Sequence, residues 1–225
     1  MTGSHQHHDH EGPAPDVTTM YSEEFWDERY SSSAALWSGN PNPQLVAEVA
    51  NLPAGKALDA GCGEGADVIW LAERGWQVTG VDVSGVALAR GAAHASEFGT
   101  EVAARISWER HDLLSWIPPA QSYDLISAQY MQVHPELRAP LVDRLAAGVA
   151  PGGTLLLVGH SPSDLTTTVH RPQQPERFFT AAEIAAALDA SAWAMVVCET
   201  RPRQVRDPDG QLVTVHDEVI RAKRS

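Results

Sequence analysis

The chain has 225 residues, a length that suits one ordinary domain and excludes two full-sized ones. Apolar residues make up 43% of it, which supports a buried core, and its formal net charge of −13 repels a phosphate backbone, so we expect no nucleic acid partner. No apolar run approaches the roughly 18 residues of a membrane span, so we expect no membrane partner.

Residues 1–20 are predicted to form a disordered, His-rich N-terminal tail, because they lack apolar periodicity and carry glycine, proline and histidine. The possible metal ligands in this tail are His5, His7, His8, Asp9 and His10. Imidazole suits zinc, nickel and copper, but a flexible tract lacks the outer hydrogen bonds that orient metal ligands, so we expect no metal there. A metal-binding protein that uses this tail is one alternative interpretation.

The folded domain is predicted to span 21–225. Ser22 can cap a helix whose first turn is acidic, and that helix carries Phe25, Trp26 and Tyr30 at helical spacing. We expect Phe25 to lie in the core. A serine-rich loop with Trp37 follows, and the next helix is predicted to begin at the Asn-Pro pair 42–43.

From residue 56 onward, short apolar strands alternate with helices. Strands are predicted at 56–60, 76–84, 104–114, 122–130 and 151–160, and helices at 66–75, 84–99, 137–149 and 180–188. Thr180 and Glu183 fit a capping box at the start of the last helix. Two final strands, 192–201 and 212–220, are joined by Asp-Pro-Asp-Gly and are predicted to form an antiparallel hairpin.

This alternation predicts a parallel sheet with helices on both faces, which binds its ligand outside the carboxyl ends of the strands. The first strand leads into a turn in which Gly61 and Gly63 let the backbone approach a ligand. The turn also fits the dinucleotide pattern, so an NAD-dependent oxidoreductase is a rival interpretation. Asp59 disfavours that rival, because its carboxylate repels a pyrophosphate and suits the cationic amino group and sulfonium of S-adenosylmethionine (SAM).

Two more acids end the next two predicted strands. Asp82 can accept hydrogen bonds from both hydroxyls of a ribose, and Asp112 can accept one from an adenine amino group. Three acids at the ends of three consecutive strands fit a single cationic nucleoside.

The segments ALDAGCGEGADVIWLAERG, VTGVDVS, RHDLL and APGGTLLLVG resemble the successive motifs of class I SAM-dependent methyltransferases, over about residues 20–225. The resemblance implies SAM as the cofactor and a Rossmann-like, doubly wound seven-stranded α/β sheet, mostly parallel with an antiparallel last strand and helices on both faces. FWDERY followed by Trp37 is similar to the branch that contains the thiopurine and tellurite-resistance methyltransferases, in which an N-terminal helix and loop cover SAM.

The resemblance also implies which residues contact the cofactor. They are Tyr30, Trp37, Asp59, Gly61, Gly63, Asp82, Val83, Asp112, Leu113, Gln129 and Tyr130. Tyr30 and Trp37 would lie beside the methionine part, and Gln129 and Tyr130 beside the sulfonium. The Pro-Pro-aromatic signature of amino-methylating DNA enzymes is absent, which again argues against a nucleic acid substrate.

The methyl acceptor is expected to be a small molecule. A soft, ionised nucleophile such as a thiolate or hydrogen selenide needs little beyond alignment, whereas a hydroxyl or ammonium group needs a general base. His134 and His160 follow strands that point at the pocket and are the catalytic candidates. Arg171 and Arg177, in the loop 161–178, are candidates for binding an anionic substrate.

Only two cysteines occur, which suits a reducing cytoplasm. Cys62 is small enough for the glycine turn, and Cys198 is predicted to lie in the core because its strand is apolar. They form no C-x-x-C pair, so no structural zinc site is indicated. We expect a monomer or homodimer. A SAM-binding sensor that no longer catalyses is a further alternative.

Overall fold

The computed structural model describes residues 19–169, 171 and 174–225, so most of the predicted His-rich tail lies outside the described residues. A single seven-stranded sheet has the order β3-β2-β1-β4-β5-β7-β6. The strands are β1 (Lys56–Ala60), β2 (Gln77–Asp82), β3 (Ile106–Arg110), β4 (Tyr123–Gln129), β5 (Val149–His160), β6 (Trp193–Arg206) and β7 (Leu212–Arg224). Strands β1 to β5 pair in parallel, and β7 runs antiparallel to both of its neighbours, which confirms the predicted fold class.

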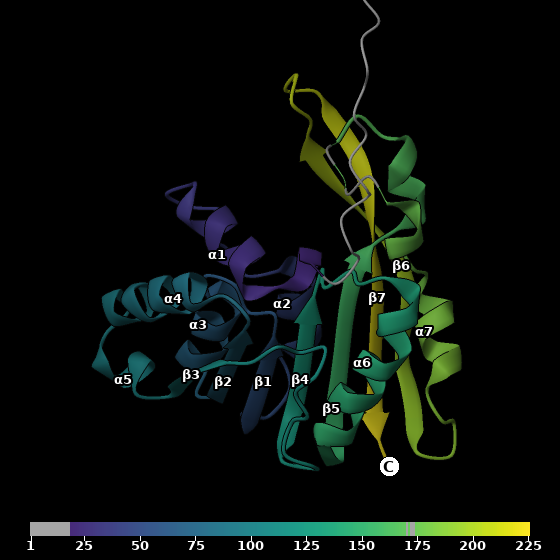
Figure 1. Ribbon diagram of the computed structural model, residues 1–225. Helices are drawn as coiled ribbons and strands as arrows, with labels where there is room; N and C mark the ends of the chain where they lie inside the picture. The colour runs from purple at the N-terminus through teal and green to yellow at the C-terminus, as the bar shows by residue number, and fades with distance from the viewer. Residues whose placement is uncertain (1–18, 170, 172–173) are drawn as a thin grey trace, which may run out of the picture.

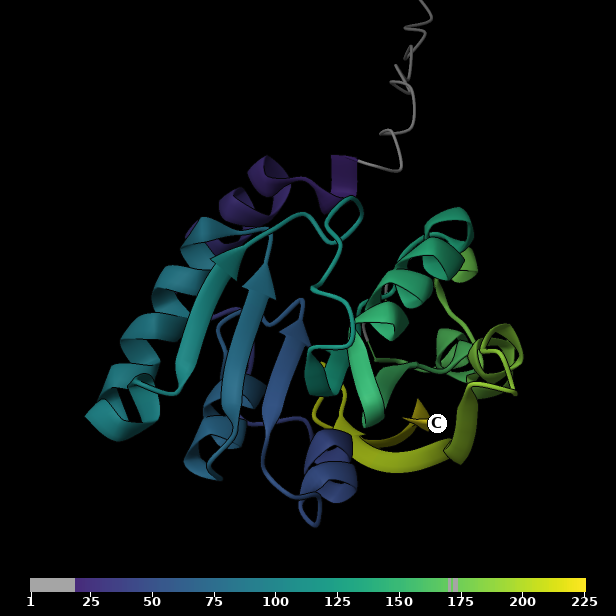
Figure 2. The same cartoon turned by 90° about the horizontal axis from the view of Figure 1, so that it is seen from below.

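Helices cover both faces of the sheet (Figures 1 and 2). The α-helices are α1 (Glu23–Ser31), α2 (Pro43–Val49), α3 (Ala66–Glu73), α4 (Gly85–Glu97), α5 (Thr100–Ala103), α6 (Pro135–Gly148) and α7 (Ala181–Ala187), and the 3-10 turns are η1 (Thr19–Tyr21), η2 (Pro162–Thr166) and η3 (Pro175–Arg177). Within the described ranges, no helix is long and apolar enough to cross a membrane.

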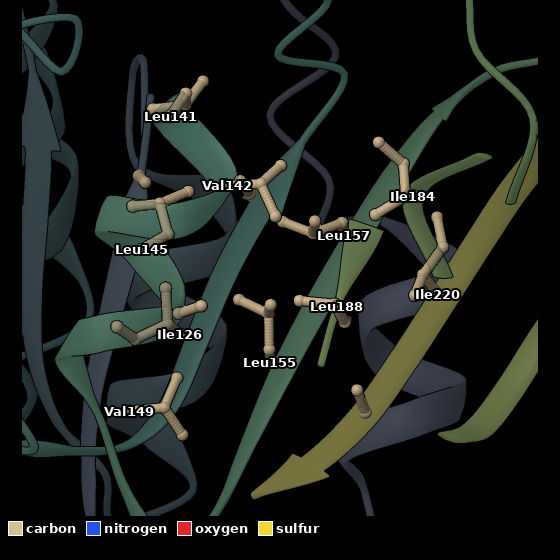
Figure 3. Close-up of a cluster of buried hydrophobic side chains, with 14 of the residues drawn as sticks. Ile126, Leu141, Val142, Leu145, Val149, Leu155, Leu157, Ile184, Leu188 and Ile220 are labelled. Atoms are coloured by element: carbon tan, nitrogen blue, oxygen red, sulfur yellow. The ribbon is translucent and has the colours of Figure 1, made fainter. Parts of the chain in front are cut away.

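Strand β5 shows how one sequence pattern builds both cores. Leu155 and Leu157 face α6 and α7, where they pack with Leu145 in the cluster of Figure 3. The alternate residues Leu156 and Val158 belong to the second cluster, in which the other face of the sheet packs against α2 and α3. Since successive side chains of a strand point to opposite faces, a continuous apolar run is what a strand buried on both sides requires.

The predicted helix caps are confirmed. The Oγ atom of Ser22 accepts a hydrogen bond from the amide of Phe25 at 3.2 Å, and the Asn42 side chain accepts one from the amide of Gln44 at 2.9 Å. Thr180 and Glu183 form both bonds of the capping box that opens α7. These local bonds satisfy amide groups that have no partner inside the helix.

Several predicted boundaries are wrong. Thr19 and Met20 belong to η1 and not to the tail. Strand β3 ends at Arg110, two residues before Asp112, so Asp112 lies in the turn that follows. Helix α6 begins at Pro135, because proline is well placed in a first helical turn.

Two predicted core residues are not in the core. Cys198 is exposed, because β6 is the edge strand of the sheet and its outer positions lack cover. Phe25 is only half-buried, because α1 lies against α4, above the end of the sheet, and buries Tyr30 instead.

The hairpin of β6 and β7 is longer than predicted and projects beyond the sheet (Figure 1). Strand β5 ends at His160, which pairs with Asp217, and residues 212–216 of β7 continue past this point, where their strand partner is β6. The projecting part stands at the carboxyl end of β4 and β5. It therefore forms one side of the edge where such sheets bind ligands.

Candidate functional site

The order of the sheet reverses between β1 and β4, and the predicted glycine turn lies at this point. The amides of Gly61 and Cys62 both donate to the carbonyl of Val81, at 2.8 and 3.0 Å, which holds the turn against the end of β2. Gly63 has a φ of +53°, and a β-carbon added there would stand 2.9 Å from the hydroxyl of Tyr30. Glycine is therefore needed for the N-terminal segment to lie directly on the turn.

Two predicted acids are buried at this turn. Asp59 is 3% exposed and Asp82 is 7% exposed. The carboxylate of Asp82 accepts hydrogen bonds from the amides of Gly63 and Ser84, both at 2.9 Å. Burial penalises the charged form of each carboxyl group and so raises the pKa of Asp59 and that of Asp82 above the ordinary value for aspartate.

A third carboxylate, which the sequence analysis missed, completes the group. Asp67, in the first turn of α3, accepts a hydrogen bond from the amide of Asn42 at 2.6 Å. The side chain of Asn42 donates in turn to Oε1 of Gln129 at 3.0 Å, so a predicted site residue is tied to the same network. Burial raises the pKa of Asp67 to about 6, and Asp67 in turn raises that of Asp59.

None of these three carboxylates forms an ion pair with a side chain of the described residues. Asp59, Asp67 and Asp82 therefore leave a concentrated negative charge at the switch point of the sheet. Backbone amides relieve part of the cost of burying it. A cationic ligand would relieve more.

The third predicted acid, Asp112, has a different setting. It is exposed, and its carboxylate accepts hydrogen bonds from the amide of Leu114 and the hydroxyl of Ser115 within its own turn. Asp112 and Val83 both line a cavity of about 590 Å³ that Tyr21 and the start of α1 enclose from the other side. This space lies beside the buried carboxylates and has room for a flat heterocycle.

Leu113 departs from its predicted role. Its side chain is 6% exposed and belongs to the hydrophobic cluster beside α6, so it does not line this cavity. The change of direction follows from the early end of β3, since the residues after Arg110 form a turn that aims Leu113 inward.

The N-terminal segment lies over the glycine turn, with Tyr30 and Trp37 next to Gly63. Tyr30 is buried, and its hydroxyl accepts a hydrogen bond at 3.0 Å from the indole of Trp37, which is itself 52% exposed. Glu64, a residue that the sequence analysis missed, accepts hydrogen bonds from the amides of Leu36 and Trp37 and pairs with Arg90 at 2.9 Å. We call α1 and residues 32–41 the cover.

Tyr130 marks the other side of the turn. Its φ of +53° is uncommon for a residue with a β-carbon and represents strain of about 1–3 kcal/mol that the surroundings must hold. Its hydroxyl donates to Asp217 at 3.0 Å, and its ring stacks on His160 with centroids 4.3 Å apart. Arg203 also donates to Asp217, at 2.8 Å, so the projecting hairpin fixes this strained residue.

The two predicted catalytic histidines are placed differently. His160 has a buried Nδ1 atom without a hydrogen-bond partner among the described residues. Burial, together with Arg171 and Arg203, lowers the pKa of His160 to about 3, so the ring is neutral near pH 7. His134 is half-buried at the start of α6, where its amide donates to the hydroxyl of Tyr21 at 3.0 Å.

The structure also separates the two predicted anion-binding arginines. Arg171 pairs at 2.8 Å with Asp164, which is fully buried. Arg177 donates through Nε to the carbonyl of Gln132 at 2.8 Å and forms no ion pair within the described part of the chain. Gln132 lies in the segment that follows β4, so Arg177 is the one bound to the ligand edge of the sheet.

Residues 57–153, from β1 into β5, match the model of a family described as a methyltransferase domain. This part of the chain therefore resembles a methyltransferase domain. The match includes the glycine turn with Asp59, Asp67 and Asp82, whereas the cover and the hairpin lie outside it.

Two curated relatives resemble this domain in sequence. Trans-aconitate 2-methyltransferase of Rhizobium meliloti (strain 1021) is 33% identical over 58% of this chain and 47% of its own length. Thiopurine S-methyltransferase of Vibrio cholerae is 28% identical over 62% of this chain and 70% of its own length, in agreement with the predicted branch. The chain spans about half the length of several curated relatives that it matches.

A solved structure has the same fold as most of this chain. It concerns the conversion of a disulfide bond into a thioacetal group during echinomycin biosynthesis. Its TM-score is 0.71, with 20% identity over 90% of this chain and 91% of the other. At this identity the likeness shows the fold alone.

The raised pKa of Asp67 predicts how the ligand-free domain responds to pH. The folded state holds the Asp67 proton more tightly than the unfolded state, so the stability from this proton is present below about pH 4 and is lost as pH rises through about 6. Asp67→Asn keeps an acceptor for the Asn42 amide without the charge. We expect its melting temperature to exceed that of the wild type near pH 7.5, and the difference to shrink near pH 5.

Thermal melts of both proteins without ligand at the two pH values check this expectation. Asp189→Asn is the control, because Asp189 is fully exposed. A variant of Asp67 that melts below the wild type by the same margin at both pH values would contradict the raised pKa.

Proposed function

We propose that this protein is a SAM-dependent methyltransferase that acts on a small-molecule acceptor. The observation that supports this most is the group of carboxylates at the switch point, Asp59, Asp67 and Asp82, which have no cation of their own among the described residues. SAM carries positive charge on its amino group and on its sulfur. Its ribose offers two hydroxyls, and its adenine needs an open, partly apolar space.

The residues present fit this cofactor. Asp82 would accept from the ribose hydroxyls, and Val83 and Asp112 line the cavity that would take the adenine. Asp59 and Gln129 would face the methionine part, with Tyr130 beside the sulfur. Tyr30 and Trp37 of the cover would close over it. When bound, SAM supplies a methyl group on a positively charged sulfur, which an aligned acceptor displaces in line.

The residues expected to line the acceptor pocket favour a nucleophile that ionises without a general base from the protein. A group with a pKa of about 3 is a poor general base near pH 7, so His160 is suited to lining the pocket and accepting a hydrogen bond. The relatives named above methylate a polycarboxylic acid and a sulfur atom, both of which can react as anions. We infer a thiolate, another soft sulfur, selenium or tellurium anion, or a carboxylate. His134 is the base candidate for any acceptor that needs one.

The rival interpretations have specific counterarguments or tests. An NAD-dependent oxidoreductase would place a pyrophosphate beside Asp59 and Asp67, whose carboxylates repel it. Metal binding by the tail is tested by nickel or zinc titration with and without residues 1–12. A non-catalytic sensor would bind SAM without turnover. We further propose a cytoplasmic monomer or homodimer, in keeping with the free thiols of Cys62 and Cys198.

Asp82→Ala is predicted to weaken SAM binding on the order of a hundredfold or more. It removes two charge-assisted hydrogen bonds, each contributing roughly 1.5–3 kcal/mol. Isothermal titration with SAM measures the effect. Asp82→Asn retains one acceptor oxygen, so its SAM affinity should lie between those of the wild type and Asp82→Ala. An affinity equal to the wild type in a folded Asp82→Ala protein would refute the placement of the ribose.

Trp37→Ala is predicted to weaken SAM binding about tenfold while changing the ligand-free melting temperature little. The indole is about half exposed and makes one hydrogen bond, to the buried Tyr30, so its loss removes cover but little core. Thermal melts with and without SAM separate the two effects. A large loss of stability without ligand would instead identify Trp37 as part of the core.

The direct test of the function is release of S-adenosylhomocysteine from SAM with a panel of acceptors: thiols, selenide, tellurite with a reductant, iodide, carboxylic acids, phenols and amines. We expect turnover with the groups that react as anions, at a rate that shows no ionisation of His160 between about pH 6 and 9. Turnover confined to phenols or amines would refute this and favour His134 as a base. Tight SAM binding with no turnover would favour the sensor.

A further inference from the structure

The arginines at the ligand edge of the sheet fall into two groups. Five of them are ion-paired with carboxylates: Arg90 with Glu64, Arg110 with Glu23, Arg171 with Asp164, Arg201 with Glu48 and Arg203 with Asp217. Arg138 and Arg177 are both half-buried, yet neither forms an ion pair with any described residue. In a chain of net charge −13, two such cations on neighbouring segments require an explanation.

Arg177 is held by neutral groups only. Its Nε donates to the carbonyl of Gln132 at 2.8 Å, and Nη1 lies 3.5 Å from Oε1 of Gln174. Its guanidinium lies over the ring of Tyr21, 5.5 Å from the centroid. These contacts fix the position of the charge but leave it without a counter-ion.

Arg138, on α6, is bound to the same short segment. Its Nη2 donates to the carbonyls of Glu176 and Phe178, at 2.9 and 3.1 Å, on either side of Arg177. Its Nε is buried and has no hydrogen-bond partner in the described part of the chain. Such a buried donor costs about 1–3 kcal/mol when unpaired, a cost that a single water molecule would offset.

The segment beneath the two arginines connects them to the proposed cofactor site. Residues 129–134 follow β4: Gln129 is bonded to Asn42 on the cofactor side, and Gln132 is bonded to Arg177 on the other. Between them, Met131 approaches Gly61 of the glycine turn. Met131 and Arg138 also line a cavity of about 30 Å³, which holds a water molecule but not an organic acceptor. An acceptor must therefore lie over the segment and not beneath it.

We propose that Arg177 binds a negatively charged group of the methyl acceptor, with Arg138 holding in place the segment that carries it, so that the substrate is a small organic anion, of which a carboxylate is the simplest. This rests on the proposed function. The planar guanidinium suits a carboxylate because it can donate two parallel hydrogen bonds to it. Arg171 is not part of this site, because Asp164 occupies it.

The test compares two ligands that differ mainly in charge, 4-mercaptobenzoate and 4-mercaptobenzamide. The protein is saturated with S-adenosylhomocysteine, and each ligand, as well as trans-aconitate, is titrated calorimetrically. We expect the two carboxylates to bind at least tenfold more tightly than the amide. Arg177→Gln should weaken the carboxylates at least tenfold and change the amide and S-adenosylhomocysteine by less than about twofold, whereas Arg177→Lys should fall between.

Arg206→Gln is the matched control. Arg206 also lacks an ion pair among the described residues and donates to a carbonyl, that of Gly210, but it lies at the exposed turn of the hairpin. Arg206→Gln should leave the affinities for the carboxylates, the amide and S-adenosylhomocysteine unchanged. Arg138→Gln provides a second variant: because it loosens the segment that carries Arg177, it should weaken the carboxylates less than Arg177→Gln does, without affecting the amide.

Three results would overturn the proposal: equal affinity of the wild type for the carboxylate and the amide, equal effects of Arg177→Gln and Arg206→Gln, or no binding of any carboxylate to a protein that binds S-adenosylhomocysteine. In the last case the cofactor site stands and the acceptor is not an organic anion. Failure to bind S-adenosylhomocysteine at all would instead refute the proposed function.

Discussion

Burial of negative charge without a protein cation is the constraint on which the rest of the site depends. Asp59 and Asp82 lie at the ends of neighbouring strands, and Asp67 opens the helix between them. Burial makes each costly to ionise; backbone amides offset part of that cost at Asp67 and Asp82, and a hydrogen bond with the Ser127 side chain does so at Asp59. The glycine turn brings one of those amides to Asp82, and the start of α2 brings another to Asp67. The turn and α2 are therefore positioned by the same electrostatic requirement.

The sequence was sufficient for features that depend on local order along the chain. The strands, the capping residues and the positions of Asp59 and Asp82 follow from periodicity and from the rule that parallel strands present their carboxyl ends together. Asp112 shows the limit of that rule, because a strand that ends two residues early moves its acid into a turn. Local pattern cannot specify where a strand stops pairing.

Partners that are distant in sequence could not be predicted. Asp67 reads as an ordinary acid at a helix start, since its partner Asn42 is brought to it only by the packing of α2. Arg171 and Arg177 look equivalent in the sequence. Only the fold shows that one meets a buried carboxylate and the other a carbonyl. The same holds for Glu64, whose contacts come from α4 and from the N-terminal segment.

Glu64 links the glycine turn to two elements that lie far from it in the sequence. It belongs to the glycine turn, yet its carboxylate holds the amides of Leu36 and Trp37 in the cover and the guanidinium of Arg90 in α4. One carboxylate therefore ties three separate parts of the chain together. Loss of its charge would loosen the hold of the glycine turn on the cover and on α4 at the same time.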